Sequence, residues 1–163
     1  MNNINIISVD SDYFNNKKNT PLFVDTVFNN FSYLAKEEKL KHSFAEINKL
    51  LNSPKFKGFF IKKNNHIIGY LLGEIMNLDD GRKVYYISYL YVSHLFRKHG
   101  FASKLLSIVI DLTKNLGLNA VMLICDTENN EVHDFYAKRG FMLDMKLRRY
   151  EKHDVFSLPV GYY

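Results

Sequence analysis

The sequence is short of cysteine and of long apolar runs, and each shortage excludes a class of protein. Cys125 is the only cysteine among 163 residues, so no intramolecular disulfide can form and an intracellular setting is expected. No apolar run is long enough to span a bilayer, so we expect no membrane protein. The six histidines are scattered without paired ligand spacing, so the sequence predicts no metal site.

The composition is that of a globular protein with a modest positive charge. Hydrophobic residues make up 47% of the chain and charged residues 24%, which predicts one domain over residues 1–163. The first ten residues lack the cationic start and apolar stretch of a secretory signal, so a cytoplasmic location is expected. The net charge of +5 is spread along the chain, which suits an anionic cofactor but predicts no nucleic-acid partner.

Apolar periodicity predicts a mixed α/β (α+β) fold. Helices are expected over residues 21–34, 44–51, 101–116 and 131–139, and strands over residues 5–9, 56–62, 66–76, 83–92, 120–125, 141–147 and 154–160. Strand 120–125 follows strand 83–92 through a crossover helix, so these two should be parallel. The prediction is a mostly antiparallel sheet with a central parallel pair and helices on both faces.

The segment 85–116 organises the chain as strand, basic loop, glycine and helix. The first turn of a helix has unpaired N–H groups and a partial positive charge, which favours a phosphate or pyrophosphate there. Gly100 lets the backbone approach such a ligand closely, and Arg97, Lys98 and His99 add charge. An ordinary strand-to-helix turn with solvated charges is the alternative.

Two motifs resemble a known family. Residues 97–102, RKHGFA, resemble the R/Q-x-x-G-x-G/A signature of the GCN5-related N-acetyltransferase (GNAT) superfamily. Residues 129–141, NNEVHDFYAKRGF, resemble its second signature, N-x-x-A-x-x-F-Y-x-K-x-G-F, with Val132 in place of alanine. The resemblance covers residues 67–156 well. It implies a sheet whose central parallel strands splay apart, acetyl-CoA as the cofactor, and transfer of an acetyl group to an amine.

The resemblance also implies roles for particular residues. The backbone of the central strand would pair with the pantetheine arm, and Asn129 would hydrogen-bond that arm unless it serves only as a helix cap. The implied cofactor-binding residues are Leu90, Tyr91, Val92, Arg97, Lys98, His99, Gly100, Phe101, Ala102, Ser103, Asn129 and Tyr136.

Acetyl transfer from a thioester needs a proton acceptor for the amine, a donor for the leaving thiolate and stabilisation of the oxyanion. Tyr136 stands at the family position for the acid, with packing of its helix as the alternative. The family's usual base glutamate is missing from the central strands. Glu74, Asp126 and His133 remain as candidate bases, of which we favour Glu74, and a route without a base also stays open. Cys125 is interpreted as a packed thiol rather than a nucleophile.

The acceptor is the least defined part of the prediction. It is expected to be an amine-bearing small molecule, such as a polyamine, or a peptide N-terminus or lysine. Tyr33 and the stretch 149–155 resemble substrate-side features of peptide acetyltransferases. Alternation along strand 83–92 predicts Tyr85, Tyr89 and Tyr91 on one face and Tyr86 on the other. A monomer or homodimer is expected, and an acyl-CoA-binding sensor or scaffold without turnover is the main alternative function.

Overall fold

The structure, a computed structural model, describes residues 3–15, 29, 44–64, 66–126, 129–147, 149–150 and 153–161. Its elements are β1 (Ile4–Asp10), α1 (Ser11–Asn15), α3 (Phe44–Leu51), β2 (Phe56–Lys63), β3 (His66–Asn77), β4 (Lys83–Val92), the short 3₁₀ helix η1 (His94–Phe96), α4 (Phe101–Asn115), β5 (Ala120–Asp126), α5 (Asn130–Ala137), β6 (Met142–Leu143), β7 (Arg149–Tyr150) and β8 (His153–Pro159). The predicted helix 21–34, with Tyr33, lies outside the described residues, as do the side chains predicted to matter at residues 149–152.

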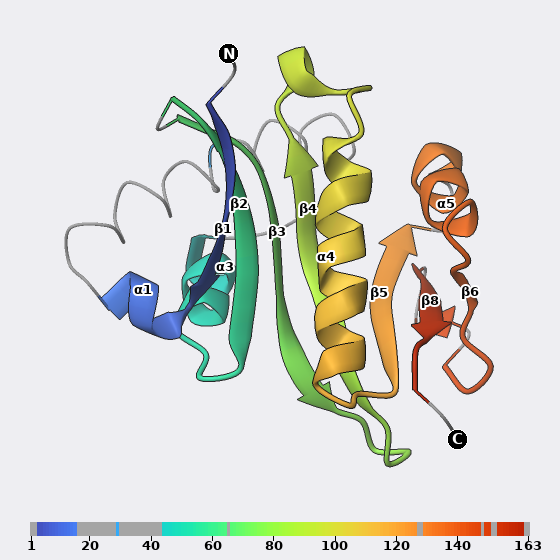
Figure 1. Ribbon diagram of the computed structural model, residues 1–163. Helices are drawn as coiled ribbons and strands as arrows, with labels where there is room; N and C mark the ends of the chain where they lie inside the picture. The colour runs from blue at the N-terminus through green and yellow to red at the C-terminus, as the bar shows by residue number, and fades with distance from the viewer. Residues whose placement is uncertain are drawn as a thin grey trace.

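Within the described residues, eight strands form one sheet in the order β1-β2-β3-β4-β5-β8-β6, with β7 pairing to β8 (Figure 1). β4 and β5 are parallel, and the other pairs are antiparallel. The crossover helix between β4 and β5 requires this parallel pair. The predicted mixed sheet with a central parallel pair is therefore confirmed.

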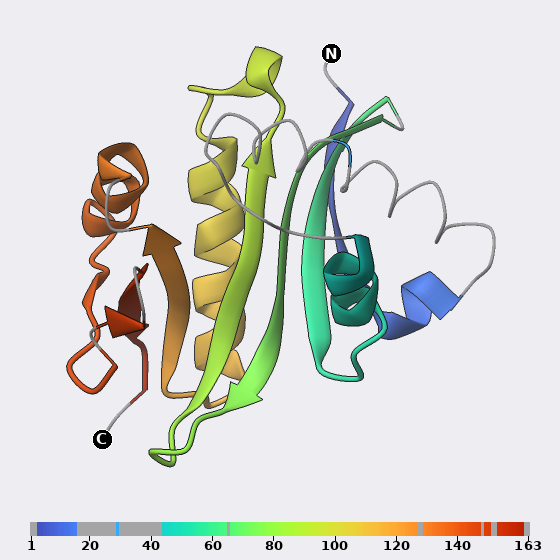
Figure 2. The ribbon, with the colours of Figure 1, turned by 180° about the vertical axis from the view of Figure 1, so that it is seen from behind.

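Helices cover both faces of the sheet, as predicted. α4 lies across one face and buries Leu105, Leu106 and Val109 in the larger core cluster (Figure 1). α3 lies on the other face, where Ile47 and Leu51 are buried in a second cluster (Figure 2). Because each helix buries one apolar stripe, the sheet becomes the central layer of the molecule.

Glycines mark both ends of α4. Gly100 has a φ of +80° at the N-cap, and Gly117 has a φ of +69° just after the last turn. The Gly117 N–H donates to the Lys114 carbonyl at 3.0 Å, and the Leu118 N–H donates to the Thr113 carbonyl at 3.1 Å. This pattern satisfies terminal carbonyls and ends the helix at Asn115, one residue before the predicted end at residue 116.

The predicted strand 141–147 is wrong in length, because only Met142–Leu143 is extended as β6. The Asp144 carboxylate accepts hydrogen bonds from the backbone N–H groups of Lys146 and Leu147, at 3.0 and 2.8 Å. These bonds turn the chain away from the sheet, as aspartate side chains commonly do. β6 still pairs antiparallel with β8, so the expected closing pair of strands is present.

Asp144 also joins three distant parts of the fold. Its two carboxylate oxygens accept hydrogen bonds from the Arg82 guanidinium at 2.7 and 2.9 Å, and one also accepts from the Ser157 hydroxyl at 2.7 Å. The carboxylate is 1% exposed. Burial alone would raise the pKa of Asp144, but the hydrogen bonds from Arg82, Ser157 and the two backbone N–H groups hold it well below its usual range.

We expect Asp144→Asn to cost about 2 kcal/mol of unfolding free energy at neutral pH, because it removes the buried carboxylate from Arg82 and leaves only the Asp80 carboxylate, 2.8 Å away, to balance its charge. A depressed native pKa stabilises the fold above the unfolded pKa of about 4, and this contribution is lost as the pH falls below it. Urea unfolding from pH 6 to pH 2 should therefore show that the difference in unfolding free energy between wild type and variant becomes smaller. If this difference stays constant over the pH range, the ionised Arg82–Asp144 pair is not its cause.

Candidate functional site

β4 and β5 separate after a short paired stretch. Their parallel ladder ends at Tyr86 and Met122. Both strands continue past this rung, to Val92 and Asp126, yet within the described residues they form no further pairs with each other. Figure 1 shows the two strand ends diverging beside α4. The splay that the motifs implied is therefore present, and it exposes one edge of β4 to a ligand.

A β-bulge lies in β4 close to the point where the strands separate. Leu72 of β3 faces Tyr89, but the next residue, Gly73, faces Ile87, so Ser88 is the extra residue. Gly73 lies against the β4 backbone, because a Cβ added there would be 2.3 Å from the Tyr86 carbonyl oxygen. The absence of a side chain at this position therefore lets β3 and β4 pair around the bulge.

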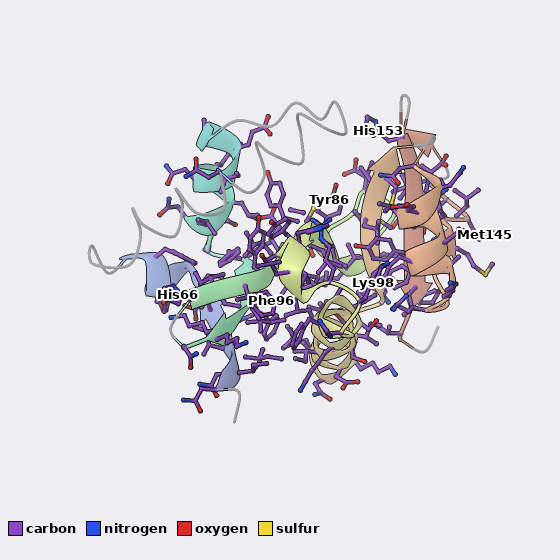
Figure 3. The ribbon with its side chains drawn as sticks, turned by 90° about the horizontal axis from the view of Figure 1, so that it is seen from above. His66, Tyr86, Phe96, Lys98, Met145 and His153 are labelled. Carbon is purple, nitrogen blue, oxygen red and sulfur yellow. The ribbon has the colours of Figure 1, made fainter. Side chains whose placement is uncertain are left out.

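The bulge changes which face each β4 tyrosine occupies. The prediction from simple alternation is wrong, because Tyr85 packs in the cluster under α4 whereas Tyr89 and Tyr91 pack in the cluster with α3. Tyr86 lies on the side away from α4 and packs near Met122 (Figure 3). Three tyrosines therefore share the α3 side of β4, and Tyr85 is the one set apart.

The basic loop turns sharply into α4. Lys98 and Gly100 have φ values of +65° and +80°. The Arg97 Nε donates to the Val92 carbonyl at 2.9 Å, and its guanidinium lies 5.6 Å from the centre of the Tyr91 ring. At the helix N-terminus, Gly100 provides no side-chain cap, and a Cβ added there would meet no atom within 4 Å. The N-terminus of α4 therefore has no side-chain cap and leaves room beside Gly100, which suits an anionic ligand.

The second motif forms α5, which begins at Asn129. The Asn129 side-chain oxygen accepts a hydrogen bond from the Val132 N–H at 3.3 Å, so this residue caps the helix. Its amide NH₂ group takes no part in this cap and can donate to a cofactor arm.

Tyr136 points from α5 into the core and is 6% exposed. Its ring packs edge-on against Phe135 and Phe141, with centroids 5.1 and 5.3 Å away. Burial, and then the nearby Cys125, raise the pKa of the Tyr136 phenol, whereas the Arg139 charge opposes the shift. The phenol is therefore protonated at neutral pH, which a proton donor requires.

Arg139 links α5 to the start of α4. One guanidinium nitrogen, Nη1, donates to the Phe135 carbonyl at 2.5 Å, and the other, Nη2, donates to the Ser103 hydroxyl. The guanidinium also lies 3.8 Å from the centre of the Phe135 ring. A cation is thus fixed beside the first turn of α4.

Glu74 lies on the opposite side of the sheet from Tyr136. It faces Tyr86 directly across β3 and β4, at the last rung before the splay. The Ser53 hydroxyl donates to the Glu74 carboxylate at 3.0 Å, which fixes the position of that carboxylate. Burial raises the pKa of the Tyr86 phenol, with smaller contributions from Cys125 and Glu74. Two side chains that can exchange protons, Glu74 and Tyr136, therefore lie on opposite sides of the sheet.

The other candidate bases are less well placed. His133 lies on α5, on the same side as Tyr136, where it is 3.7 Å from the Asp154 carboxylate and packs against Phe156. The side chain of Asp126 lies outside the described part of the chain. Cys125 is buried, and burial followed by Asp154 raises the pKa of its thiol to about 12. The interpretation of Cys125 as a packed thiol is therefore confirmed.

Several features near the site were not predicted from the sequence. Ser53, Tyr86 and Arg139 contact candidate site residues, and Gly73 shapes the bulge, but none was assigned a role in advance. A glycine directly before a glutamate in an apolar strand was the one local signal available for Gly73.

The described residues offer neither a metal site nor a membrane-spanning helix, and their groove beside β1 is separate from the splay. They contain no group of three or more histidine, cysteine, aspartate or glutamate side chains able to hold a metal ion. Among the helices in the described ranges, none is long and apolar enough to cross a membrane. A groove of about 470 Å³ lies between β1 and α4, lined in part by Ile6, Phe101 and Ile108. This groove is on the flank of α4 away from α5, and hence outside the splay.

A mixed sheet split at its central parallel pair, with a glycine-led helix beside the split, is the architecture of acetyl-CoA-dependent N-acetyltransferases. The model of the acetyltransferase (GNAT) family matches residues 22–141. The chain therefore belongs to the GNAT family of N-acetyltransferases, and its cofactor is acetyl-CoA. A search of curated proteins found no match.

Solved structures share this fold at low sequence identity. Arabidopsis thaliana NAA60 in complex with a bisubstrate analogue superposes with a TM-score of 0.69 at 14% identity, covering 96% of this chain and 97% of that one. The ribosomal-protein-S18-alanine N-acetyltransferase of Escherichia coli gives 0.68 at 14% identity, covering 98% and 96%. An aminoglycoside acetyltransferase from an uncultured soil metagenomic sample, in complex with sisomicin, gives 0.67 at 17% identity, covering 90% and 93%.

Proposed function

We propose that the protein moves an acetyl group from acetyl-CoA to a primary amine by direct attack in a ternary complex. The observation that carries the proposal is the combination of the splayed β4 edge with an uncapped, glycine-led helix at the same end of the sheet. The first N–H groups of α4, from Phe101 to Ser103, and the loop residues 97–100 hold the diphosphate. The β4 backbone at residues 90–92 pairs with the pantetheine arm, and Asn129 donates its amide to it.

Each side of the opening has its own chemical role in this proposal. Bound acetyl-CoA supplies an acetyl thioester at the splay. Glu74 accepts the proton of the acceptor ammonium on the α3 side, directly or through a water, while Ser53 holds its carboxylate. Tyr136 donates its phenolic proton to the departing sulfur on the α5 side. The positions of Glu74 and Tyr136 on opposite sides of the sheet favour Glu74 over His133 as the base.

The acceptor is an amine-bearing small molecule or peptide. The structural relatives named above include enzymes for protein N-termini and for aminoglycosides, so both classes belong in the test. Purified protein with acetyl-CoA should release free CoA thiol when given a peptide with a free N-terminus, a lysine peptide, a polyamine or an aminoglycoside. The acetylated amine should then be identified by mass. Tight acetyl-CoA binding with no CoA release across this panel would favour the sensor or scaffold function instead.

The use of acetyl-CoA and the presence of a single cysteine, Cys125, are both consistent with a cytoplasmic location.

Tyr136→Phe removes only the phenolic oxygen, so we expect kcat to fall about a hundredfold while acetyl-CoA affinity and thermal stability change little. Because the pKa of Tyr136 is raised, wild-type activity should show no decline up to about pH 10 from loss of this proton. The measurement is kcat against pH for both proteins. An unchanged kcat in the variant would assign Tyr136 to packing alone.

Glu74→Gln keeps the size and the Ser53 contact but removes the basic carboxylate. We expect kcat/KM at pH 7 to fall about tenfold or more, with the difference shrinking at high pH, where the acceptor amine is already neutral. Ser53→Ala is the companion variant and should show a smaller loss of the same pH-dependent kind. A loss in Glu74→Gln that is equal at every pH would point to substrate binding rather than proton transfer.

A further inference from the structure

Arg139 occupies a position that the family motif leaves open. In N-x-x-A-x-x-F-Y-x-K-x-G-F it falls on the variable residue between lysine and glycine, so the resemblance assigns it no role. The structure nevertheless holds its guanidinium in three ways, by the Phe135 carbonyl, the Ser103 hydroxyl and the face of the Phe135 ring. These contacts order the planar group of Arg139 before any ligand binds.

The fixed guanidinium lies at the phosphate end of the proposed cofactor site. Ser103 belongs to the first turn of α4, directly after Phe101 and Ala102, at a helix N-terminus that has no side-chain cap. A guanidinium has five N–H donors in a rigid fork, and the two hydrogen bonds named above use one on each terminal nitrogen. The remaining donors can bind a phosphate without large loss of side-chain entropy, because the group is already ordered.

We propose that Arg139 binds a phosphate at the nucleotide end of acetyl-CoA, bridging α5 and α4 across the bound cofactor. The inference rests on the proposed function, since it requires the cofactor to lie at the N-terminus of α4. Charge-assisted bonds from arginine to phosphate are about twice as strong as neutral ones. The Ser103 hydroxyl and the Phe135 ring are positioning groups that orient the guanidinium. Both phosphate sources, the diphosphate and the 3′-phosphate of the adenosine, present the same chemistry to it.

Calorimetric titration of the full chain with three ligands tests this inference. Coenzyme A carries all phosphates, dephospho-coenzyme A lacks the 3′-phosphate, and pantetheine carries no phosphate. Arg139→Gln retains a donor for Ser103 but removes the charge, and we expect it to weaken coenzyme A binding about tenfold or more. Binding of pantetheine should be unchanged. A loss limited to coenzyme A identifies the 3′-phosphate, and a loss shared with dephospho-coenzyme A identifies the diphosphate.

Lys114→Gln is the matched control, because it removes one positive charge from the far end of α4 and should leave all three affinities unchanged. Arg139→Lys keeps the charge but lacks the forked guanidinium, so its affinity for coenzyme A should lie between those of wild type and Arg139→Gln. If Arg139→Gln does not fold, Arg139→Lys takes its place in the test. Equal weakening of all three ligands, or no change with coenzyme A, would overturn the role of Arg139. Failure of the wild type to bind coenzyme A would instead remove the proposed function itself.

Discussion

Gly100→Asp is expected to abolish acetyl-CoA binding, with an affinity loss of at least about a hundredfold. Gly100 stands at the N-cap of α4 with a φ of +80°, and a Cβ there would project into open space in front of the helix. An aspartate would place an anion where the diphosphate is proposed to lie, next to a helix end that otherwise attracts negative charge. Calorimetric titration, repeated with Arg97→Ala added, measures the loss.

Gly117→Asp provides the control for backbone strain. Gly117 has a comparable φ of +69°, ends the same helix, and likewise has no atom within 4 Å of an added Cβ. Its substitution should cost similar or greater stability, because an anion at a helix C-terminus is unfavourable, yet leave acetyl-CoA affinity intact. If both variants lose binding to the same extent, general destabilisation is the cause, and the placement of the diphosphate at Gly100 fails.

Gly73→Ala is expected to cost about 4 kcal/mol of unfolding free energy or more, an unusually large effect for one methyl group. The added Cβ would lie 2.3 Å from the Tyr86 carbonyl oxygen and 2.6 Å from the Tyr85 ring. Backbone cannot move aside as a flexible side chain does, so β3 and β4 must shift apart beside the bulge. Urea unfolding of wild type and variant gives the difference.

Gly81→Ala supplies the comparison for Gly73. Gly81 lies in the β3–β4 turn with a φ of +91°, and no atom lies within 4 Å of an added Cβ. Its substitution should cost only about 1 kcal/mol, from the strained conformation. Similar losses at both positions would mean that the contact with the β4 backbone is not what requires glycine at position 73.

The parts of the site that are local in sequence were predictable. α4, its two terminal glycines and its basic loop lie within one continuous stretch, where helical periodicity and glycine placement act over a few residues. The parallel pairing of β4 and β5 followed from the crossover rule. The family motifs then implied the splay and acetyl-CoA.

The parts that depend on distant contacts were not predictable. The sequence around Ser88 does not indicate a bulge. Ser88 becomes the extra residue because of the register in which β3 and β4 pair beside Gly73. A strict alternation of side chains along β4 therefore predicted the wrong faces: Tyr86 shares a face with Tyr89, and Tyr85 lies on the other. Likewise, Arg82 and Asp144 are 62 residues apart, so their ion pair and the turn that shortens β6 emerge only in the folded chain.

The most direct test of the account is an NMR titration of the wild-type protein with acetyl-CoA, followed through assigned backbone amides. It needs no knowledge of the acceptor. We predict the largest shift changes at residues 90–92 on β4 and at residues 100–103 at the start of α4. Residues Ile6 and Ile108, in the groove between β1 and α4, should change little. Saturating acetyl-CoA that shifts no amide, or that shifts the amides of Ile6 and Ile108 but not those of residues 90–92, would contradict the proposed site.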